Sequence, residues 1–212
     1  MPALLGGTTA SRACCARDGR ETHRRGGIVS GSPRVSGARK DVFRGGAADF
    51  DHPLEMLAAC HERIEDRCEL LHRLGRHVAE VGADEQARQA AANVIRYFDT
   101  AGENHHRDEE EDVFPRLLSV DTGACEALVV QLREEHARMR EAWAALRPIL
   151  ARISAGEAAS FDAAQLERFT ALYRNHIELE ERELFPLAQR LFDDDALAAT
   201  GDAMARRRGV KR

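Results

Sequence analysis

Aromatic side chains and long apolar runs are both scarce in this chain of 212 residues. Phe, Trp and Tyr together supply 5% of the residues, while Ala, Leu, Glu and Arg dominate. A chain so rich in strong helix formers favours an all-α fold. No stretch approaches the roughly 20 apolar residues that a membrane span needs, so we expect a soluble protein with no membrane partner.

Paired cysteines are also missing. The chain has five cysteines, an odd number, and none of them forms a C-x-x-C pair. This pattern argues against both a disulfide framework and a zinc knuckle. The opening MPALLGG is too short and too weakly charged for a secretory signal. We therefore expect a cytoplasmic protein.

Basic residues are depleted from the middle of the chain and enriched at its ends. Residues 1–48 carry nine Lys/Arg against three Asp/Glu, and the last twelve residues carry five against one. The remaining residues, 49–200, have a formal charge near −15 although the whole chain has −5. Binding to nucleic acid requires a clustered basic face, which this acidic body does not offer. An acidic body suits cations instead.

The chain divides into a central domain and two tails. Residues 1–50 are rich in Gly, Ser and Arg and lack hydrophobic periodicity, so we expect a disordered basic tail, with an organelle transit peptide as the alternative. Residues 51–193 form the expected domain, and residues 194–212 form a basic C-terminal tail.

Turn residues and capping residues divide the domain into four helices. We expect helices over about 52–82, 84–119, 123–154 and 160–193, with Ser160 as the N-cap of the last one. Three short loops between long helices place sequential neighbours antiparallel. The sequence therefore predicts an up-down-up-down antiparallel four-helix bundle.

Each helix has an apolar stripe that is interrupted by a histidine. The interrupting residues are His61, His105, His136 and His176. Counted in residues from the predicted loop between two neighbouring helices, their histidines lie at positions that differ by only a few residues. Since each helical residue adds about 1.5 Å along the axis, the histidines lie at nearly the same level of the bundle. We expect all four imidazoles in one layer of the bundle.

Two glutamates join this layer. Glu109 follows His105 by four residues and Glu180 follows His176 by four, which places each pair on one helical face. A buried carboxylate costs several kcal/mol unless positive charge compensates it, and no Lys or Arg occupies any inward stripe. Four imidazoles and two carboxylates suit a pair of first-row metal ions with bridging carboxylates. Because zinc structural sites prefer thiolates and calcium prefers oxygen, we predict two iron ions, with manganese second.

An internal repeat supports this prediction. Residues 98–115, FDTAGENHHRDEEEDVFP, align without gaps with residues 169–186, FTALYRNHIELEERELFP. The identical pairs are Phe98/Phe169, Asn104/Asn175, His105/His176, Glu109/Glu180, Glu110/Glu181, Phe114/Phe185 and Pro115/Pro186. The doubled H-x-x-x-E-E…F-P unit, with one histidine in each preceding helix, resembles the hemerythrin-like (HHE cation-binding) family over about residues 51–192.

The resemblance implies a non-haem di-iron centre with ligands His61, His105, Glu109, His136, His176 and Glu180. Oxygen-carrying hemerythrins have a further histidine and a late aspartate where this chain has Arg140 and Glu181. The ligand set is closest to that of the iron-sulfur cluster repair di-iron proteins, but residues 1–50 do not resemble the extra N-terminal domain of those proteins.

Two functions follow as alternatives. The first is a di-iron binding protein that senses, stores or scavenges a small diatomic ligand, dioxygen or nitric oxide, or iron itself. The second is a di-iron enzyme that reduces nitric oxide or peroxide or takes part in iron-sulfur cluster repair.

Other polar residues near the stripes have less definite roles. His106 faces sideways, about 100° around from His105, and is expected as a supporting partner or a surface residue rather than a ligand. Tyr173 is either ordinary core or a hydrogen-bond donor to an iron ligand. Glu110 is a candidate partner of a ligand side chain, and Cys60 is expected as a plain buried thiol.

Overall fold

The structure, a computed structural model, describes residues 49–211, and this part of the chain is almost entirely helical. Four rods follow one another, and a shorter helix completes the fold. The first rod is α1 (Pro53–Val81), and the third is α5 (Thr122–Ser154). The second and fourth rods are composite and contain short π-helical segments. Their elements are α2 (Glu85–Tyr97), η1 (Phe98–Gly102), α3 (Glu103–Asp108), η2 (Glu109–Val113) and α4 (Phe114–Val120), then α6 (Ala163–Leu179), η3 (Glu180–Leu184) and α7 (Phe185–Leu191).

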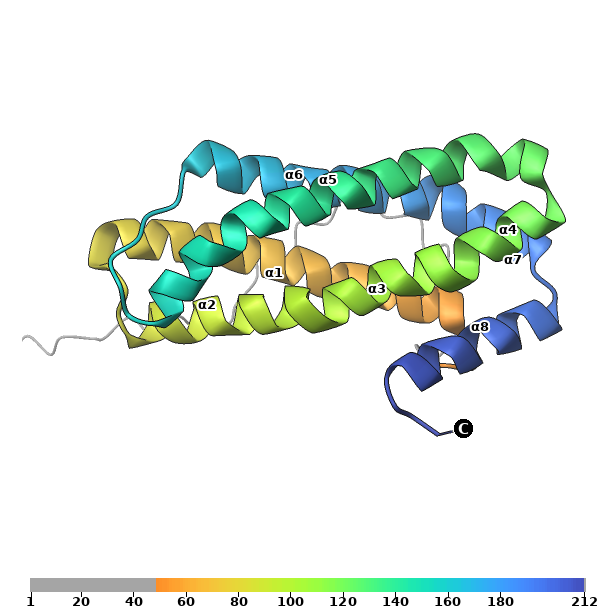
Figure 1. The fold of residues 1–212 in the computed structure, drawn as a ribbon, viewed down its shortest axis with the longest axis horizontal. Helices are drawn as coiled ribbons and strands as arrows, with labels where there is room; N and C mark the ends of the chain where they lie inside the picture. Colours follow the sequence, from red (N-terminus) through yellow and green to blue (C-terminus); the bar gives the residue numbers. More distant parts are fainter. Residues whose placement is uncertain (1–48, 212) are drawn as a thin grey trace, which may run out of the picture. The chain divides into compact units, whose positions relative to one another are not determined.

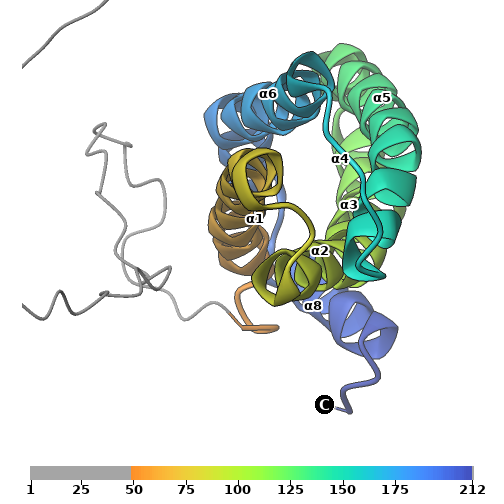
Figure 2. The ribbon, with the colours of Figure 1, turned by 90° about the vertical axis from the view of Figure 1, so that its left-hand side faces the viewer.

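The rods run up, down, up and down, and sequential rods lie side by side (Figure 1). Viewed along their length, they surround a common axis (Figure 2). The predicted antiparallel four-helix bundle is therefore confirmed. Among residues 49–211, every helix is too short or too polar to cross a bilayer.

Aspartates cap three of the four rods. Asp84, Asp121 and Asp162 each accept a hydrogen bond from a backbone N–H in the first turn of the helix that follows. The predicted cap at Ser160 is thus wrong by two residues. An aspartate carboxylate accepts the backbone hydrogen bond at Asp162, whereas Ser160 lies in the connecting loop.

The π-helical segments change the spacing of the buried residues in the fourth rod. Leu187 is only half-buried, whereas Leu184 and Ala188 are buried. A π-helical turn contains an extra residue, so inward positions after Glu180 recur at steps of four. The same step appears in the second rod, where buried Val113 and Leu117 follow Glu109.

The core forms two apolar clusters with a polar layer between them. One cluster contains Ile64, Met139 and Tyr173, and the other contains Leu57 and Leu132. On α1, His61 lies between Leu57 and Ile64, and on α5, His136 lies between Leu132 and Met139. The interrupted stripes therefore produce a buried polar layer that apolar side chains close at both ends.

The C-terminal segment differs from the expected tail. Residues 194–207 form helix α8 (Asp194–Arg207), which lies outside the ring of four rods and contacts α1, α3 and η2 (Figure 2). Its basic charge had predicted only a tail. Asp193 accepts a hydrogen bond from the backbone N–H of Ala196 and so caps the helix. The predicted N-terminal tail falls almost wholly on residues 1–48, outside the described residues.

Candidate metal centre

The two composite rods present their polar residues in the same way. In each, a histidine lies in the last turn of an α-helical stretch and a glutamate four residues later opens a π-helical segment. His105 and Glu109 come from α3 and η2, and His176 and Glu180 come from α6 and η3. π-helical turns occur often at functional sites because the extra residue redirects side chains locally.

All six predicted residues are brought together in the layer. Each is at most 1% exposed, and they form two overlapping groups whose ligand atoms lie within 4.8 Å of one another. Both groups share Glu109 and Glu180. The first group adds His61 and His105, and the second adds His136 and His176.

Glu109 spans the two groups. Its Oε1 lies 3.3 Å from Nε2 of His105, and its Oε2 lies 3.3 Å from Nε2 of His136. One carboxylate oxygen therefore faces each group. This is the arrangement that a bridging carboxylate requires.

Glu180 spans them in the same way. Its Oε2 lies 3.1 Å from Nε2 of His61, and its Oε1 lies 3.0 Å from Nε2 of His176. All four histidines thus direct Nε2 toward the carboxylates. A nitrogen lone pair and a carboxylate oxygen that approach this closely need a proton or a cation between them.

Too few hydrogen bonds form in the layer to satisfy these atoms. Both oxygens of Glu109, Oε1 of Glu180 and both ring nitrogens of His105 are buried and lack hydrogen-bond partners among residues 49–211. Nε2 of His136 and Nε2 of His176 face each other at 2.9 Å, where one proton at most fits between them. Buried polar groups without partners are costly, so the donor set fits bound cations better than it fits a purely structural core.

The protonation preferences of the carboxylates point the same way. Burial raises the pKa of Glu109 well above its ordinary value, and the charge of Glu180 raises it further. Burial also acts on Glu180, but His176 and His61 outweigh it and hold the pKa of Glu180 well below its ordinary value. The pKa of His61 and that of His176 each rise to about 9 because their carboxylate neighbours outweigh burial. The two buried carboxylates thus oppose each other's ionisation, and added positive charge in the layer would favour the ionised form of both.

Three of the four histidines also contact a carboxylate through Nδ1, on the side of the ring away from the layer. In each case Nδ1 lies within hydrogen-bond distance of a partly exposed carboxylate, which fixes the ring orientation and leaves Nε2 facing the layer. The pairs are His61 with Glu181 at 3.2 Å, His136 with Glu110 at 2.7 Å, and His176 with Glu135 at 2.9 Å.

His105 is the exception. Its Nδ1 has no hydrogen-bond partner in the described part of the chain, and burial lowers the pKa of its imidazole well below the ordinary value. In the second hairpin, the partner of His176 is Glu135, the residue before His136. The matching position in the first hairpin, the residue before His61, is Cys60, which offers His105 no carboxylate. The first half of the bundle therefore lacks the carboxylate that the second half provides.

His106 lies inside the layer rather than on the surface. It is 4% exposed, its ring stacks on that of His136 at 4.2 Å, and its Nε2 has no hydrogen-bond partner among the residues that the structure describes. The surface alternative for this residue is wrong. Tyr173 lies beside it, with ring centroids 5.9 Å apart, and is also buried.

Only one of the three supporting acids was predicted as a partner of a ligand side chain. Glu110 does contact His136, whereas Glu181 was noted only as the counterpart of an aspartate and Glu135 was not predicted. Each is next to a predicted ligand in the sequence, and that adjacency was the available signal. Arg140, which replaces a histidine of the oxygen carriers, is about half exposed and pairs with Glu110 at 2.9 Å.

Comparison with known proteins places this layer in context. The family model described as the hemerythrin HHE cation binding domain matches residues 52–188. An uncharacterized protein of Haemophilus influenzae is 32% identical over 164 residues, which cover 77% of this chain and 94% of that protein. The matched region contains all six residues of the layer.

Proposed function

The chain belongs to the hemerythrin HHE cation-binding domain family, and we propose that it holds two iron ions and uses them to bind a small ligand such as dioxygen or nitric oxide. The buried histidine and glutamate clusters fit a metal-binding protein. The identity and number of the ions and the nature of the ligand belong to the proposal.

One observation carries the proposal above all others. Four Nε2 atoms and four carboxylate oxygens meet in a layer that solvent does not reach, with too few protons to satisfy them. Burying such groups without compensation costs several kcal/mol for each charge. Two cations would remove that cost.

The contacts also support a division of the donors between two ions. His61 and His105, with one oxygen from each glutamate, would hold one ion. His136 and His176, with the other two oxygens, would hold the second. Mixed imidazole and carboxylate donors favour iron over calcium or magnesium, and the lack of thiolates argues against structural zinc.

The protein's own residues prepare the site in two ways. Glu110, Glu135 and Glu181 orient imidazoles through Nδ1, and the apolar clusters on both sides of the layer exclude bulk water. The irons, when bound, would supply redox change between ferrous and ferric states and open positions for a small ligand. Sensing, storage and scavenging all begin with that binding.

A cytoplasmic location is part of the proposal. Cys60, Cys68 and Cys125 are free thiols. Free thiols are typical of a reducing compartment.

Iron content tests the assignment of the six residues. Protein purified without chelators should carry about two irons per chain, because six donors that share two carboxylates suit a pair of ions. His105→Ala and Glu180→Ala should each lose most of this iron. His52→Ala is the matched control, because the His52 side chain is about half exposed and pairs with the equally exposed Asp49. A wild-type chain without bound metal, or variants that keep full iron, would refute the assignment.

Rapid mixing tests the function. The reduced protein mixed with dioxygen or nitric oxide should show one spectral change whose amplitude matches the amount of protein. Continued consumption of the gas, or of added peroxide, would contradict a binding role and support the enzymatic alternative.

A further inference from the structure

His106 is a buried polar residue that the proposed ligand set does not use. It is 4% exposed, and its Nε2 finds no hydrogen-bond partner among residues 49–211. One ring nitrogen from each of His106, His136 and His176 lies within 4.8 Å of the other two. A buried imidazole N–H without a partner costs free energy, so its position in the layer requires a reason.

The orientation of His106 argues against direct coordination. Its ring stacks on that of His136 with a centroid separation of 4.2 Å and an interplanar angle of 20°. The lone pair of an imidazole nitrogen lies in the ring plane, so the lone pairs of two nearly parallel rings run in separate planes and do not converge on one ion. His106 therefore lies beside the second donor group without belonging to it.

The internal repeat shows that this polar residue is confined to one side. In the alignment of the two composite rods, His106 corresponds to Ile177. Ile177 is buried and packs with the apolar cluster that contains Ile64 and Met139. The half of the centre built from His136 and His176 thus has a free hydrogen-bonding group nearby, and the residue that matches it in the other half is a hydrocarbon.

We propose that a small ligand binds at the His136/His176 half of the centre, where His106 donates a hydrogen bond to it from Nε2. The inference rests on the proposed di-iron function and adds to it a binding position and a residue that selects the ligand. Ligands with a hydrogen-bond acceptor beyond the atom that binds the metal, such as azide or dioxygen, are favoured over ligands without one. The anchored imidazoles of this half support the assignment, since both His136 and His176 have carboxylate partners at Nδ1.

Azide binding to the oxidised, iron-loaded protein tests this position. Azide is a small anion whose binding to ferric iron can be followed by visible absorption. His106→Phe keeps a ring that can stack on His136 but removes the N–H donor, and it should weaken azide binding at least tenfold, since hydrogen bonds to charged groups are among the stronger ones. His106→Gln retains a donor and should stay within about threefold of wild type. Ile177→Leu changes the matching position in the other half and should leave azide affinity unchanged.

Iron content and melting temperature, measured on every variant, separate this inference from the function on which it rests. Full iron with unchanged azide affinity in His106→Phe would overturn the inference and leave the di-iron proposal standing. Loss of iron from His106→Phe would also overturn it, because His106 would then serve metal retention. If His106→Phe does not fold, His106→Leu supplies the same comparison with a smaller side chain. A wild-type protein that binds no iron would refute the proposed function itself.

Discussion

The two hairpins of the bundle, residues 53–120 and 122–191, share their inner residues and differ around them. Both supply one histidine from the long helix, a second histidine from the last turn of an α-helical stretch, and a glutamate that opens the π-helical segment after it. His61 stacks on Phe185 and His136 stacks on Phe114, so even the ring contacts repeat. The residues that face the centre of the layer are therefore repeated in both hairpins.

The outer surroundings of the two hairpins have diverged. Asp108 in the first hairpin corresponds to Leu179 in the second. Leu179 packs in an apolar cluster, whereas Asp108 is fully buried and hydrogen-bonded to Arg207 and Arg208 of the C-terminal segment. The acid explains why α8 docks on the first hairpin. Burial raises the pKa of Asp108 even though both guanidinium groups lower it, so the ionised carboxylate depends on those two partners.

The two halves also differ in how firmly their histidines are held. Glu135 holds His176, but the matching residue in the first half is Cys60, and Nδ1 of His105 has no hydrogen-bond partner within residues 49–211. Together, these differences indicate that the central donors have one shared task, while each half has its own supporting residues.

The largest expected change in stability comes from giving the first hairpin, where it contacts α8, the residue that the second hairpin has. Asp108→Leu introduces the residue of the second hairpin and leaves Arg207 and Arg208 without their buried acceptor. Breaking a buried ion pair on one side should cost about 3 kcal/mol in the free energy of unfolding, measured in urea. Replacing both arginines by leucine as well should recover most of that loss.

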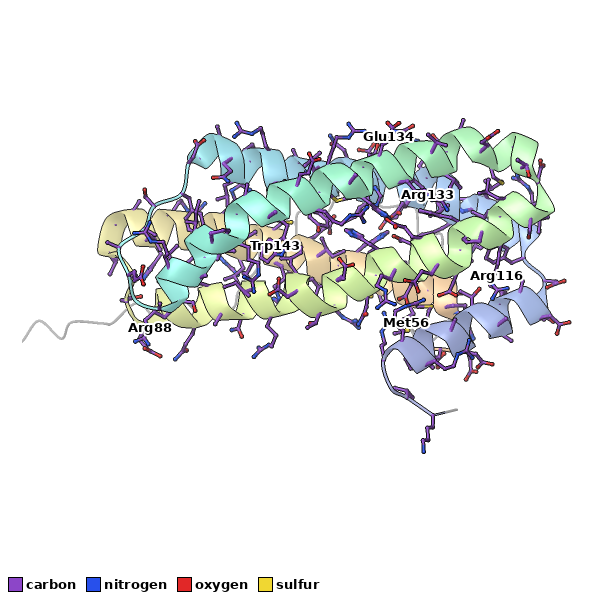
Figure 3. The ribbon with its side chains drawn as sticks, viewed as in Figure 1. Met56, Arg88, Arg116, Arg133, Glu134 and Trp143 are labelled. Atoms are coloured by element: carbon purple, nitrogen blue, oxygen red, sulfur yellow. The ribbon has the colours of Figure 1, made fainter. Side chains whose placement is uncertain are left out.

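Glu134 supplies the control for this experiment. Its carboxylate points away from the bundle on α5 (Figure 3) and lies 3.9 Å from the exposed Arg138. Glu134→Leu should change the free energy of unfolding by no more than about 0.5 kcal/mol. If Asp108→Leu and Glu134→Leu lower the free energy of unfolding equally, the buried contact of Asp108 with Arg207 and Arg208 contributes no more to stability than an exposed ion pair.

An intermediate effect, on metal affinity, is expected from removing the carboxylate that binds Nδ1 of His176. Glu135→Cys gives the second half the residue that the first half has at Cys60, and it leaves Nδ1 of His176 without its acceptor. Loss of such a partner typically weakens metal affinity 10- to 100-fold. Iron retained against a competing chelator measures the change. Glu134→Cys, one residue away on the exposed side, should retain iron as wild type does.

The smallest effect on stability is expected at Asp99 of η1, which contacts α5 near the surface. Asp99 accepts hydrogen bonds from Arg147 and from Trp143, which lies between α5 and this rod in Figure 3, whereas the second half has Thr170 at the matching position. Asp99→Thr should cost less than about 1 kcal/mol, because Arg147 is half exposed and screened by solvent.

The contribution of Asp99 has a defined pH dependence. Its hydrogen bonds with Arg147 lower its pKa below the ordinary 3.8. The stabilisation is therefore complete above about pH 4 and disappears as the pH falls through the lowered value. Urea unfolding of wild type and Asp99→Thr at several pH values should show the two curves converging in acid. Asp66→Thr, an exposed change on α1, should show no such convergence.

The sequence predicted the bundle and the meeting of its six central residues, because both follow from local periodicity. Apolar residues at steps of three and four define the buried face, and His105 and Glu109 share that face whatever their neighbours do. Short loops then leave little freedom in how the helices align. A whole layer could therefore be located from spacing alone.

Other features depended on contacts that spacing does not encode. Helix α8 docks through Arg207 and Asp108, which are 99 residues apart, so the basic segment looked like a tail. The partner of His176 is Glu135 on another helix, and its side chain lies off the predicted stripe. The extra residue in each π-helical segment cannot be predicted from composition, and it places Leu184 and Ala188 rather than Leu187 in the core.

The π-helical segments also determine where these rods can change length. Deleting one residue from η2 would return the backbone to an ordinary helix and leave the later side chains facing as before, because the π-helical turn contains one extra residue. His105 and Glu109 would keep their places, and Phe114 would stay stacked on His136. A deletion in α1 or α5 would instead turn every later side chain by about 100°, so the second and fourth rods tolerate a one-residue deletion at these levels far better than the other two.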